Sequence, residues 1–267
     1  MKKIPVMFGL AFGILLTLFN DPTHADTLSD IKKTGVLKVC LEPAYMPFEI
    51  TNKRGEIVGF DPDIAALMVQ QLGVKLELIS TAWDGIIPAL LTDKCDIIMS
   101  GMTITKERSQ TIDFSQPYMV IGQTVLLRKD LAGKIKSYKD LNTPQYKIAS
   151  KLGTTGEIAA KKYLSKAHYS SFETEQEALM EVVNGKADAF IYDSPYNAVA
   201  IGQHGADKLV FLDKPFTEEP LGWGVRKGNP EFMKWLNGFL TKMKKEGAYD
   251  QLYQKWFKNT DWLKDVQ

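Results

Sequence analysis

Cysteine and histidine are scarce in this sequence. Two cysteines in 267 residues, Cys40 and Cys95, are too few for a disulfide scaffold. The three histidines, His24, His168 and His204, stand alone, without the close spacing of metal ligands. The sequence therefore predicts no metal centre and no cofactor.

The two cysteines leave one question open. Cys40 is expected late in one strand and Cys95 early in another, and a parallel alignment of such strands would hold the sulfur atoms too far apart to bond. An oxidising compartment would nevertheless allow a bridge. Two buried thiols are the favoured interpretation, and a disulfide between them is the alternative.

An excess of charge of one sign is also missing. The chain has 33 basic and 32 acidic residues, and without residues 1–25, which carry Lys2, Lys3 and Asp21, each count is 31. A balanced chain lacks the positive field that binders of nucleic acids or anionic membranes use. Neither class of protein is expected here.

No apolar run in the sequence is long enough to span a bilayer. After Lys2 and Lys3, residues 4–19 form an apolar run of about sixteen residues, short of the roughly 20 that a membrane helix needs. Small residues then lead to Ala25. This pattern is typical of a secretory signal peptide, residues 1–25, cleaved after Ala25. We therefore expect an exported protein, free in the periplasm.

What the chain does have is a regular alternation of strand-like and helix-like segments. Such alternation is typical of an α/β protein with mostly parallel sheets. The pattern restarts at residue 123, and the tail resembles more of the first unit. The expected strands are residues 37–41, 74–80, 95–100, 123–128, 147–150, 187–192, 209–212 and 222–226.

Local signals mark where helices start. Asp61, followed by a proline, and Asp84 are expected to cap two helices of the first unit. Thr174 and Glu177 have the spacing of a capping box. Asn229, also followed by a proline, is expected to cap a helix of the tail.

Charged residues near strand ends suggest a site for a small zwitterion, which needs a fixed cation, a fixed anion and a shaped pocket. Arg108 is suited to fork a carboxylate, with Thr103 adding a hydroxyl, although a surface arginine is the alternative. The turn 153–156 offers helix N–H groups to a carboxylate, or is a plain turn. Asp193 either faces a ligand at the end of its strand or caps the next helix.

Tyr45 and Trp83 each follow a strand of the first unit and could form an aromatic wall, although such residues more often belong to a core. Together with the polar strand ends, they resemble the periplasmic amino-acid-binding proteins of bacterial ABC importers. These are type II solute-binding proteins, among them glutamine, histidine and lysine/arginine/ornithine binders. The resemblance runs from Val36 to about Phe257. It rests on GMTITKER at 101–108 and IDFSQPY at 112–118, with shorter matches at 46–49, 59–63, 85–90, 187–189 and 247–249.

The resemblance implies a two-lobe α/β fold, with a two-stranded hinge near residues 118–122 and 217–221. The first lobe would combine residues 26–118 with 221–267, and the second would hold residues 119–220. Such a protein binds a polar L-amino acid in the cleft between its lobes. It delivers that ligand, as a monomer, to the membrane permease of an ABC transporter.

The resemblance also implies roles for single residues. The matching positions are Glu42, Tyr45, Trp83, Gly101, Thr103, Arg108, Lys151, Thr155 and Asp193. Arg108 would bind the α-carboxylate of the ligand and Asp193 its α-ammonium. Glu42 stands where an aspartate is usual, so this sequence departs from the family's pattern at a position that contacts the ligand side chain. Glu42 and Lys151 match positions that hold the amide in glutamine binders, so glutamine is the first choice and arginine or lysine the second.

An enzyme is the competing interpretation. Cyclohexadienyl dehydratases, which act on prephenate or arogenate, have this fold and use a carboxylic acid in the cleft to protonate a leaving hydroxyl. Glu157, just after the 153–156 turn, is the candidate acid, but glutamate in a first helical turn is also common because it suits the helix dipole. Arg108 and Asp193 together favour the binding of a zwitterion.

Overall fold

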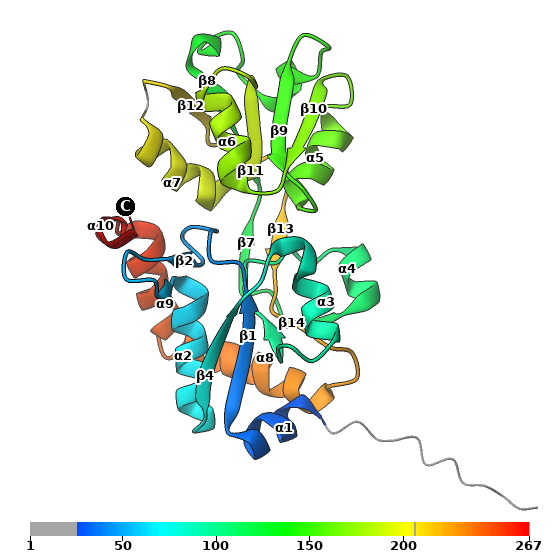
Figure 1. The fold of residues 1–267 in the computed structure, drawn as a ribbon, viewed down its shortest axis with the longest axis vertical. Helices are drawn as coiled ribbons and strands as arrows, with labels where there is room; N and C mark the ends of the chain where they lie inside the picture. The colour runs from blue at the N-terminus through cyan, green and yellow to red at the C-terminus, as the bar shows by residue number, and fades with distance from the viewer. Residues whose placement is uncertain (1–25, 206, 267) are drawn as a thin grey trace, which may run out of the picture.

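The computed structural model describes residues 26–205 and 207–266, and the expected signal peptide lies outside these ranges. Two lobes stand one above the other, joined by two strands, β7 (Met119–Ile121) and β13 (Glu219–Leu221) (Figure 1). Each lobe contains a five-stranded sheet. Within the described residues, no helix is both long and apolar enough to cross a membrane.

The lower lobe in Figure 1 is built on a mixed sheet. Its strands, in spatial order, are β4 (Lys75–Ser80), β1 (Val36–Leu41), β5 (Ile97–Ile98), β14 (Gly224–Val225) and β6 (Asp113–Phe114). β1 is parallel to β4 and β5, whereas β14 is antiparallel to its neighbours. A hairpin of β2 (Ile50–Thr51) and β3 (Ile57–Val58) lies beside it. The helices are α1 (Thr27–Thr34), α2 (Phe60–Leu72), α3 (Ile86–Leu91), α4 (Lys106–Thr111), α8 (Pro230–Lys245), α9 (Ala248–Tyr253) and α10 (Leu263–Val266).

The upper lobe has the same general plan. Its strands, in spatial order, are β10 (His168–Phe172), β9 (Lys147–Lys151), β11 (Ala189–Asp193), β8 (Gln123–Arg128) and β12 (Leu209–Leu212). β9 is parallel to β10 and β11, and β8 is antiparallel to β11 and β12. The helices are α5 (Thr155–Tyr163), α6 (Glu175–Val183) and α7 (Ser194–His204).

The predicted two-lobe α/β fold with a two-stranded connection is confirmed. The expectation of mostly parallel sheets is wrong, because two of the four strand pairings in each sheet are antiparallel. β7 and β13 pair antiparallel between the lobes, and the chain that follows β13 returns to the lower sheet as β14. The division into residues 26–118 with 221–267 and residues 119–220 remains our proposal for the domain boundaries.

The core of the lower lobe extends up to the connection. α2 buries Phe60, Ile64 and Met68, one helical turn apart, against the sheet. The Phe60 ring lies 6.3 Å from that of Tyr118, which stacks in turn on Trp223 at 5.4 Å. Tyr118 directly precedes β7, so the connection leaves the lower lobe from a packed aromatic core.

The local signals for helix starts hold in part. The capping box of Thr174 and Glu177 is present at the start of α6. Asn229 occupies the N-cap position of α8, and its side-chain oxygen accepts a hydrogen bond from the N–H of Thr27 at 2.8 Å. The prediction for Asp84 is wrong, because this residue lies inside a 3-10 turn, Trp83–Gly85, that precedes α3.

The predicted cap at Asp61 is also wrong. α2 begins at Phe60, with Gly59 at the N-cap, two residues before the predicted cap. Gly59 has a φ of 149°, and a Cβ there would lie 2.1 Å from the carbonyl oxygen of Phe48, so glycine is required. Asp61 is buried and accepts hydrogen bonds from the N–H of Gly101, at 3.0 Å, and the hydroxyl of Tyr118, at 3.2 Å. Its carboxylate thus holds the chain that leads from β5 into the cleft.

Cys40 and Cys95 form a disulfide, so the expectation of two free thiols is wrong. Their Cα atoms lie 5.7 Å apart. The expected strand 95–100 is confined to Ile97–Ile98, and Cys40 pairs with Ile98. Because Cys95 lies ahead of β5, in the turn that leaves α3, strand register does not set its distance from Cys40.

Loss of this disulfide should destabilise the lower lobe. The bridge joins residues 55 positions apart, for which the chain-entropy treatment gives about 4 kcal/mol. We expect the double variant Cys40→Ala, Cys95→Ala to lose about 2–4 kcal/mol of unfolding free energy in urea titrations. Dithiothreitol should destabilise the wild type similarly and leave the variant unchanged. Equal stability of the two proteins without reductant would contradict the prediction.

Candidate functional site

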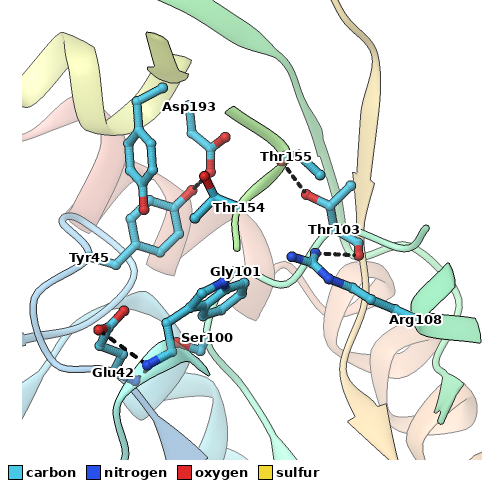
Figure 2. A pocket seen from close by; sticks show the side chains of 11 residues that line it. Glu42, Tyr45, Ser100, Gly101, Thr103, Arg108, Thr154, Thr155 and Asp193 are labelled. Atoms are coloured by element: carbon cyan, nitrogen blue, oxygen red, sulfur yellow. Dashed lines mark hydrogen bonds between the residues drawn. The ribbon is translucent and has the colours of Figure 1, made fainter. Parts of the chain in front are cut away.

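A cleft between the lobes brings most of the expected site residues together (Figure 2). It has a volume of about 310 Å³, counting its opening to solvent. Its lining consists of Glu42, Tyr45, Trp83, Ser100, Gly101, Thr103, Arg108, Thr154, Thr155, Tyr192 and Asp193. Eight of the nine expected residues are in this set. The ninth, Lys151, contacts Glu42. Their roles toward a ligand stay predictions.

Strand ends place these residues. In the lower lobe, Glu42 follows β1, Trp83 comes after β4, and residues 100–103 come after β5. In the upper lobe, residues 154–155 follow β9 and Asp193 ends β11. The carboxyl ends of strands from both sheets therefore face one cleft, which is where open α/β sheets bind ligands.

Arg108 reaches the cleft from the first turn of α4, a helix capped by the Thr105 side chain. Its guanidinium donates to the carbonyl of Thr103 at 2.9 Å and, across the cleft, to the carbonyl of Gly153 at 3.3 Å. It also lies over the ring of Trp83, 5.1 Å from the centroid, at a distance typical of cation–π contacts. The side chain therefore lies along the cleft rather than out in solvent.

Further polar contacts join the lobes in this closed arrangement. The indole N–H of Trp83 donates to the carbonyl of Gly153 at 3.0 Å, the same oxygen that Arg108 contacts. The hydroxyls of Thr103 and Thr155 lie 3.4 Å apart, as Figure 2 shows. Strand-end residues of one lobe thus serve as hydrogen-bond partners for the other.

Asp193 is 7% exposed and occupies the N-cap position of α7. In the part of the chain that the structure describes, its side chain makes no capping bond. Instead, the Tyr45 hydroxyl donates to one carboxylate oxygen, and the Gln123 amide donates to the other at 2.5 Å. Burial raises the pKa of Asp193 to about 7, and the charge of Glu219 adds to this shift. The two hydrogen bonds and the charge of Arg108 act in the opposite direction.

Lys151 lies between two carboxylates. Its ammonium contacts Glu42 across the cleft and Glu175 of its own lobe at 2.7 Å. The side chains of Lys151 and Glu175 are each 1% exposed. Burial by itself lowers the pKa of Lys151, but the two carboxylates outweigh it and the pKa is raised overall. Lys151 therefore does not point to solvent, and this end of the site has one cation for two carboxylates.

Gly101 is required for Tyr45 to reach the cleft. It has a φ of +54°, and a Cβ there would lie 2.3 Å from a ring carbon of Tyr45. The Tyr45 ring is 4% exposed and stacks on Phe48 at 4.8 Å. Tyr45 is therefore a core residue whose hydroxyl reaches the cleft, and its role as an aromatic wall for a ligand stays a prediction.

Sequence reasoning missed six polar residues of this region. Three of them line the cleft: Ser100, Thr154 and Tyr192. Gln123 contacts Asp193, and Glu219 contacts Thr155, both of which line the cleft. Glu175 contacts Lys151. Gln123 directly follows the first expected hinge segment, and Glu219 lies within the second. A polar residue on a strand that crosses between the lobes faces either the cleft or solvent. The polar character of these two positions was therefore a signal in the sequence that could have marked them as candidates for the cleft.

Glu157, the candidate acid of an enzyme, is not among the described residues that line the cleft. Its carboxylate accepts a hydrogen bond from the N–H of Gly153 at 2.6 Å and pairs with Lys161 at 2.7 Å. Both contacts stabilise the turn and the first turn of α5, which is the structural role expected of a glutamate at this position.

Comparison with known proteins identifies a family. Residues 37–259 match the family described as bacterial extracellular solute-binding proteins, family 3. A probable histidine-binding protein of Neisseria gonorrhoeae is 35% identical over 83% of each chain. An ABC transporter glutamine-binding protein of Bacillus subtilis is 34% identical, over 87% of this chain and 85% of its own.

Two solved structures share the overall fold. An ancestral amino-acid-binding protein, a precursor of cyclohexadienyl dehydratase, is 52% identical with a TM-score of 0.81, covering 87% of this chain and 100% of its own. A protein from Wolinella succinogenes, described as a binding component of an ABC transporter and complexed with lysine, is 49% identical with a TM-score of 0.84. The match covers 86% of this chain and 99% of that protein.

The raised pKa of Asp193 predicts a pH-dependent stability difference. Between pH 4 and 7, folded ligand-free protein keeps a proton on Asp193 that the unfolded chain releases, so this group destabilises the fold as pH rises. We therefore expect the free energy of unfolding of Asp193→Asn to increase relative to that of the wild type as pH rises from 4 to 7. The increase should be at most about 1.4 kcal/mol per pH unit.

Urea titrations of ligand-free protein at several pH values measure this difference. Asp250→Asn makes the same substitution at an exposed position of the lower lobe and serves as the control. A difference for Asp193→Asn that stays constant from pH 4 to 7 would contradict the prediction.

Proposed function

The chain belongs to the bacterial extracellular solute-binding proteins of family 3, and on that basis we propose that it binds one L-amino acid between its lobes. One observation carries the proposal. A guanidinium from the lower lobe, Arg108, and a buried carboxylate from the upper lobe, Asp193, line the same cleft. Opposite charges held on opposite lobes suit a ligand that carries both an ammonium and a carboxylate.

The contacts around these two residues suit such a zwitterion. Arg108 has donors that can turn from the carbonyls of Thr103 and Gly153 to a ligand carboxylate, in the fork geometry that guanidinium favours. The N–H of Thr155 lies in the first turn of α5, where backbone donors lack helical partners. An ammonium next to Asp193 would favour its ionised form and reverse the effect of burial.

The charges around Lys151 indicate which kind of ligand side chain this end of the cleft favours. With Glu42 and Glu175 both within ion-pair distance of one lysine, an additional cation is easier to accommodate here than a neutral amide. We therefore place lysine or arginine first and glutamine, the first choice from the sequence, second. The relative in complex with lysine supports this order.

A dehydratase activity is not part of the proposal. The relatives are named as binding proteins, and the 52% identical ancestral protein is itself described as an amino-acid-binding protein. Glu157 is engaged by Gly153 and Lys161, as described above. We propose instead that the loaded protein acts in the periplasm as a monomer and passes its amino acid to the permease of an ABC transporter.

A thermal-shift screen of the twenty amino acids tests the proposed function. A ligand at 100 times its dissociation constant stabilises the folded state by about 2.7 kcal/mol. We expect the largest shifts with lysine, arginine or glutamine. The absence of a shift with any amino acid, in protein freed of bound ligand by unfolding and refolding, would contradict the proposal.

Arg108 is expected to be the carboxylate anchor. Truncating one partner of a buried charged pair costs about 2–5 kcal/mol, so Arg108→Ala should weaken binding by roughly 30-fold or more. Calorimetry with the amino acid found by the screen measures the loss. Lys106→Ala removes an exposed charge from the same helix and should leave affinity unchanged. Near-native affinity of Arg108→Ala would remove Arg108 from the site.

Glu42 is expected to select for a cationic side chain. Glu42→Gln removes one carboxylate but leaves Lys151 paired with Glu175, so no buried charge is left without a partner. Affinity for lysine and arginine should fall about tenfold or more relative to glutamine, because a hydrogen bond to a charged group is lost. Competition binding measures the ratio, with Glu77→Gln on β4 as the exposed control. An unchanged ratio of the affinities for the cationic amino acids and glutamine would show that Glu42 does not help to recognise the ligand side chain.

A further inference from the structure

A buried carboxylate lies at the crossing between the lobes. Glu219, the first residue of β13, is 6% exposed. One of its oxygens lies 2.6 Å from the hydroxyl of Thr155 and 3.1 Å from that of Thr103, and both donate to it. The Gln123 amide donates to the same oxygen at 3.2 Å, and the Thr217 hydroxyl donates to the other at 2.8 Å. Four neutral donors therefore satisfy this charge.

Thr103 is tied to β13 through the backbone. It forms a β-bridge with Leu221, and the N–H of Ile104 donates to the carbonyl of Pro220 at 2.8 Å. These contacts hold Thr103 beside Glu219 whatever the angle between the lobes. The hydrogen bond from Thr103 is therefore a fixed feature of the lower lobe and its hinge strand.

Gln123 also stays close to the hinge. It begins β8, two residues after the end of β7, and its N–H donates to the Thr217 hydroxyl at 2.8 Å. Its contact with Glu219 therefore depends little on rotation of the lobe as a whole.

Thr155 is placed differently, because it opens α5 at the end of the upper sheet that faces the cleft. The Gln123 amide also lies 3.3 Å from the Thr155 hydroxyl. Glu219 itself lies on the crossing strand β13, and we expect rotation about β7 and β13 to carry the start of α5 away from it. Of the four donors, Thr155 is thus the one whose bond we expect opening of the cleft to break. Its bond is also the shortest of the four, at 2.6 Å.

We propose that Glu219 is a positioning residue that holds the closed state from the hinge, through its hydrogen bond to Thr155. The inference rests on the proposed function, in which closure retains the amino acid. It differs from contacts to the ligand, since Glu219 already has its donors from the protein. Arg108 is left to neutral carbonyl partners, and so remains available to a carboxylate.

The unfavourable placement of the Glu219 carboxylate near a second acidic group supports a role in closure. The Gln123 amide lies between Glu219 and Asp193, donating to both, so two acidic groups are close together. Burial raises the pKa of Asp193, and repulsion by Glu219 adds to this shift and further disfavours the ionised form. A second carboxylate here is unfavourable unless its own hydrogen bonds offset the repulsion, and the bond to Thr155 is the one that we expect closure to form.

Stopped-flow fluorescence of wild type and Glu219→Gln tests the proposal, with lysine, arginine and glutamine as probes and Trp83 in the cleft as reporter. Loss of a hydrogen bond to a charged group should speed dissociation about tenfold or more and change association much less. Thr155→Val should have a similar effect, and the double variant should be little worse than either single variant. Glu218→Gln, the exposed neighbouring residue, is the matched control and should match the wild type.

Several outcomes would overturn the inference. They are unchanged dissociation in Glu219→Gln, an effect confined to association, or additive losses in the double variant. If Glu219→Gln does not fold, Thr155→Val tests the same bond from the other side. If the wild type binds no amino acid, the proposed function fails, but small-angle scattering still tests the hinge. Ligand-free Glu219→Gln should then have a larger radius of gyration than the wild type, and equal radii would refute the role of Glu219.

Discussion

Charge buried between the lobes is the constraint on which the rest of this structure depends. Lys151 of the upper lobe contacts Glu42 of the lower, and Asp193 of the upper lobe accepts a hydrogen bond from Tyr45 of the lower. A buried ionised group that loses its partner costs several kcal/mol, so such groups favour the arrangement in which partners meet. These pairings therefore favour the closed arrangement of the two lobes, together with the aromatic contact of Tyr45 with Tyr192 at 5.8 Å.

The fold supports this constraint by making the lower half of the cleft rigid. Residues 100–103 form part of the lower wall of the cleft, and their backbone must be held in place for Ser100 and Thr103 to line it. The buried Asp61 fixes the N–H of Gly101, and the missing Cβ of Gly101 admits the Tyr45 ring. The disulfide of Cys40 ties β1 to the turn ahead of β5, the two strands whose ends provide most of the lower wall. Rigid walls and a two-stranded crossing leave rotation between the lobes as the easy motion.

Local sequence patterns predicted the structure correctly where the position of a residue depends only on the strand or helix that contains it. The strands 123–128 and 209–212 and the capping box of Thr174 follow directly from periodicity and cap chemistry. Asp193 could be placed at the carboxyl end of its own strand from the local pattern. That Arg108 shares a cleft with it was expected only from the resemblance to amino-acid-binding proteins, because the two residues belong to different lobes. The errors at Asp61 and Cys95 have another cause. Each side chain is placed by a partner in a different segment, and local signals carry no information about that partner.

The contacts of Glu219 show the limit of sequence reasoning most clearly. Its donors Thr103 and Thr155 lie 116 and 64 positions away, one in the loop after β5 and the other at the start of α5. No period or motif relates such positions, since their approach depends on how the two sheets are oriented across the hinge. Hinge strands connect the lobes covalently, so a polar side chain there can respond to their angle without contacting a ligand. The proposed function and the proposed role of Glu219 together assign selectivity for a ligand and stability of closure to separate residues, Glu42 and Lys151 for the first and Glu219 for the second.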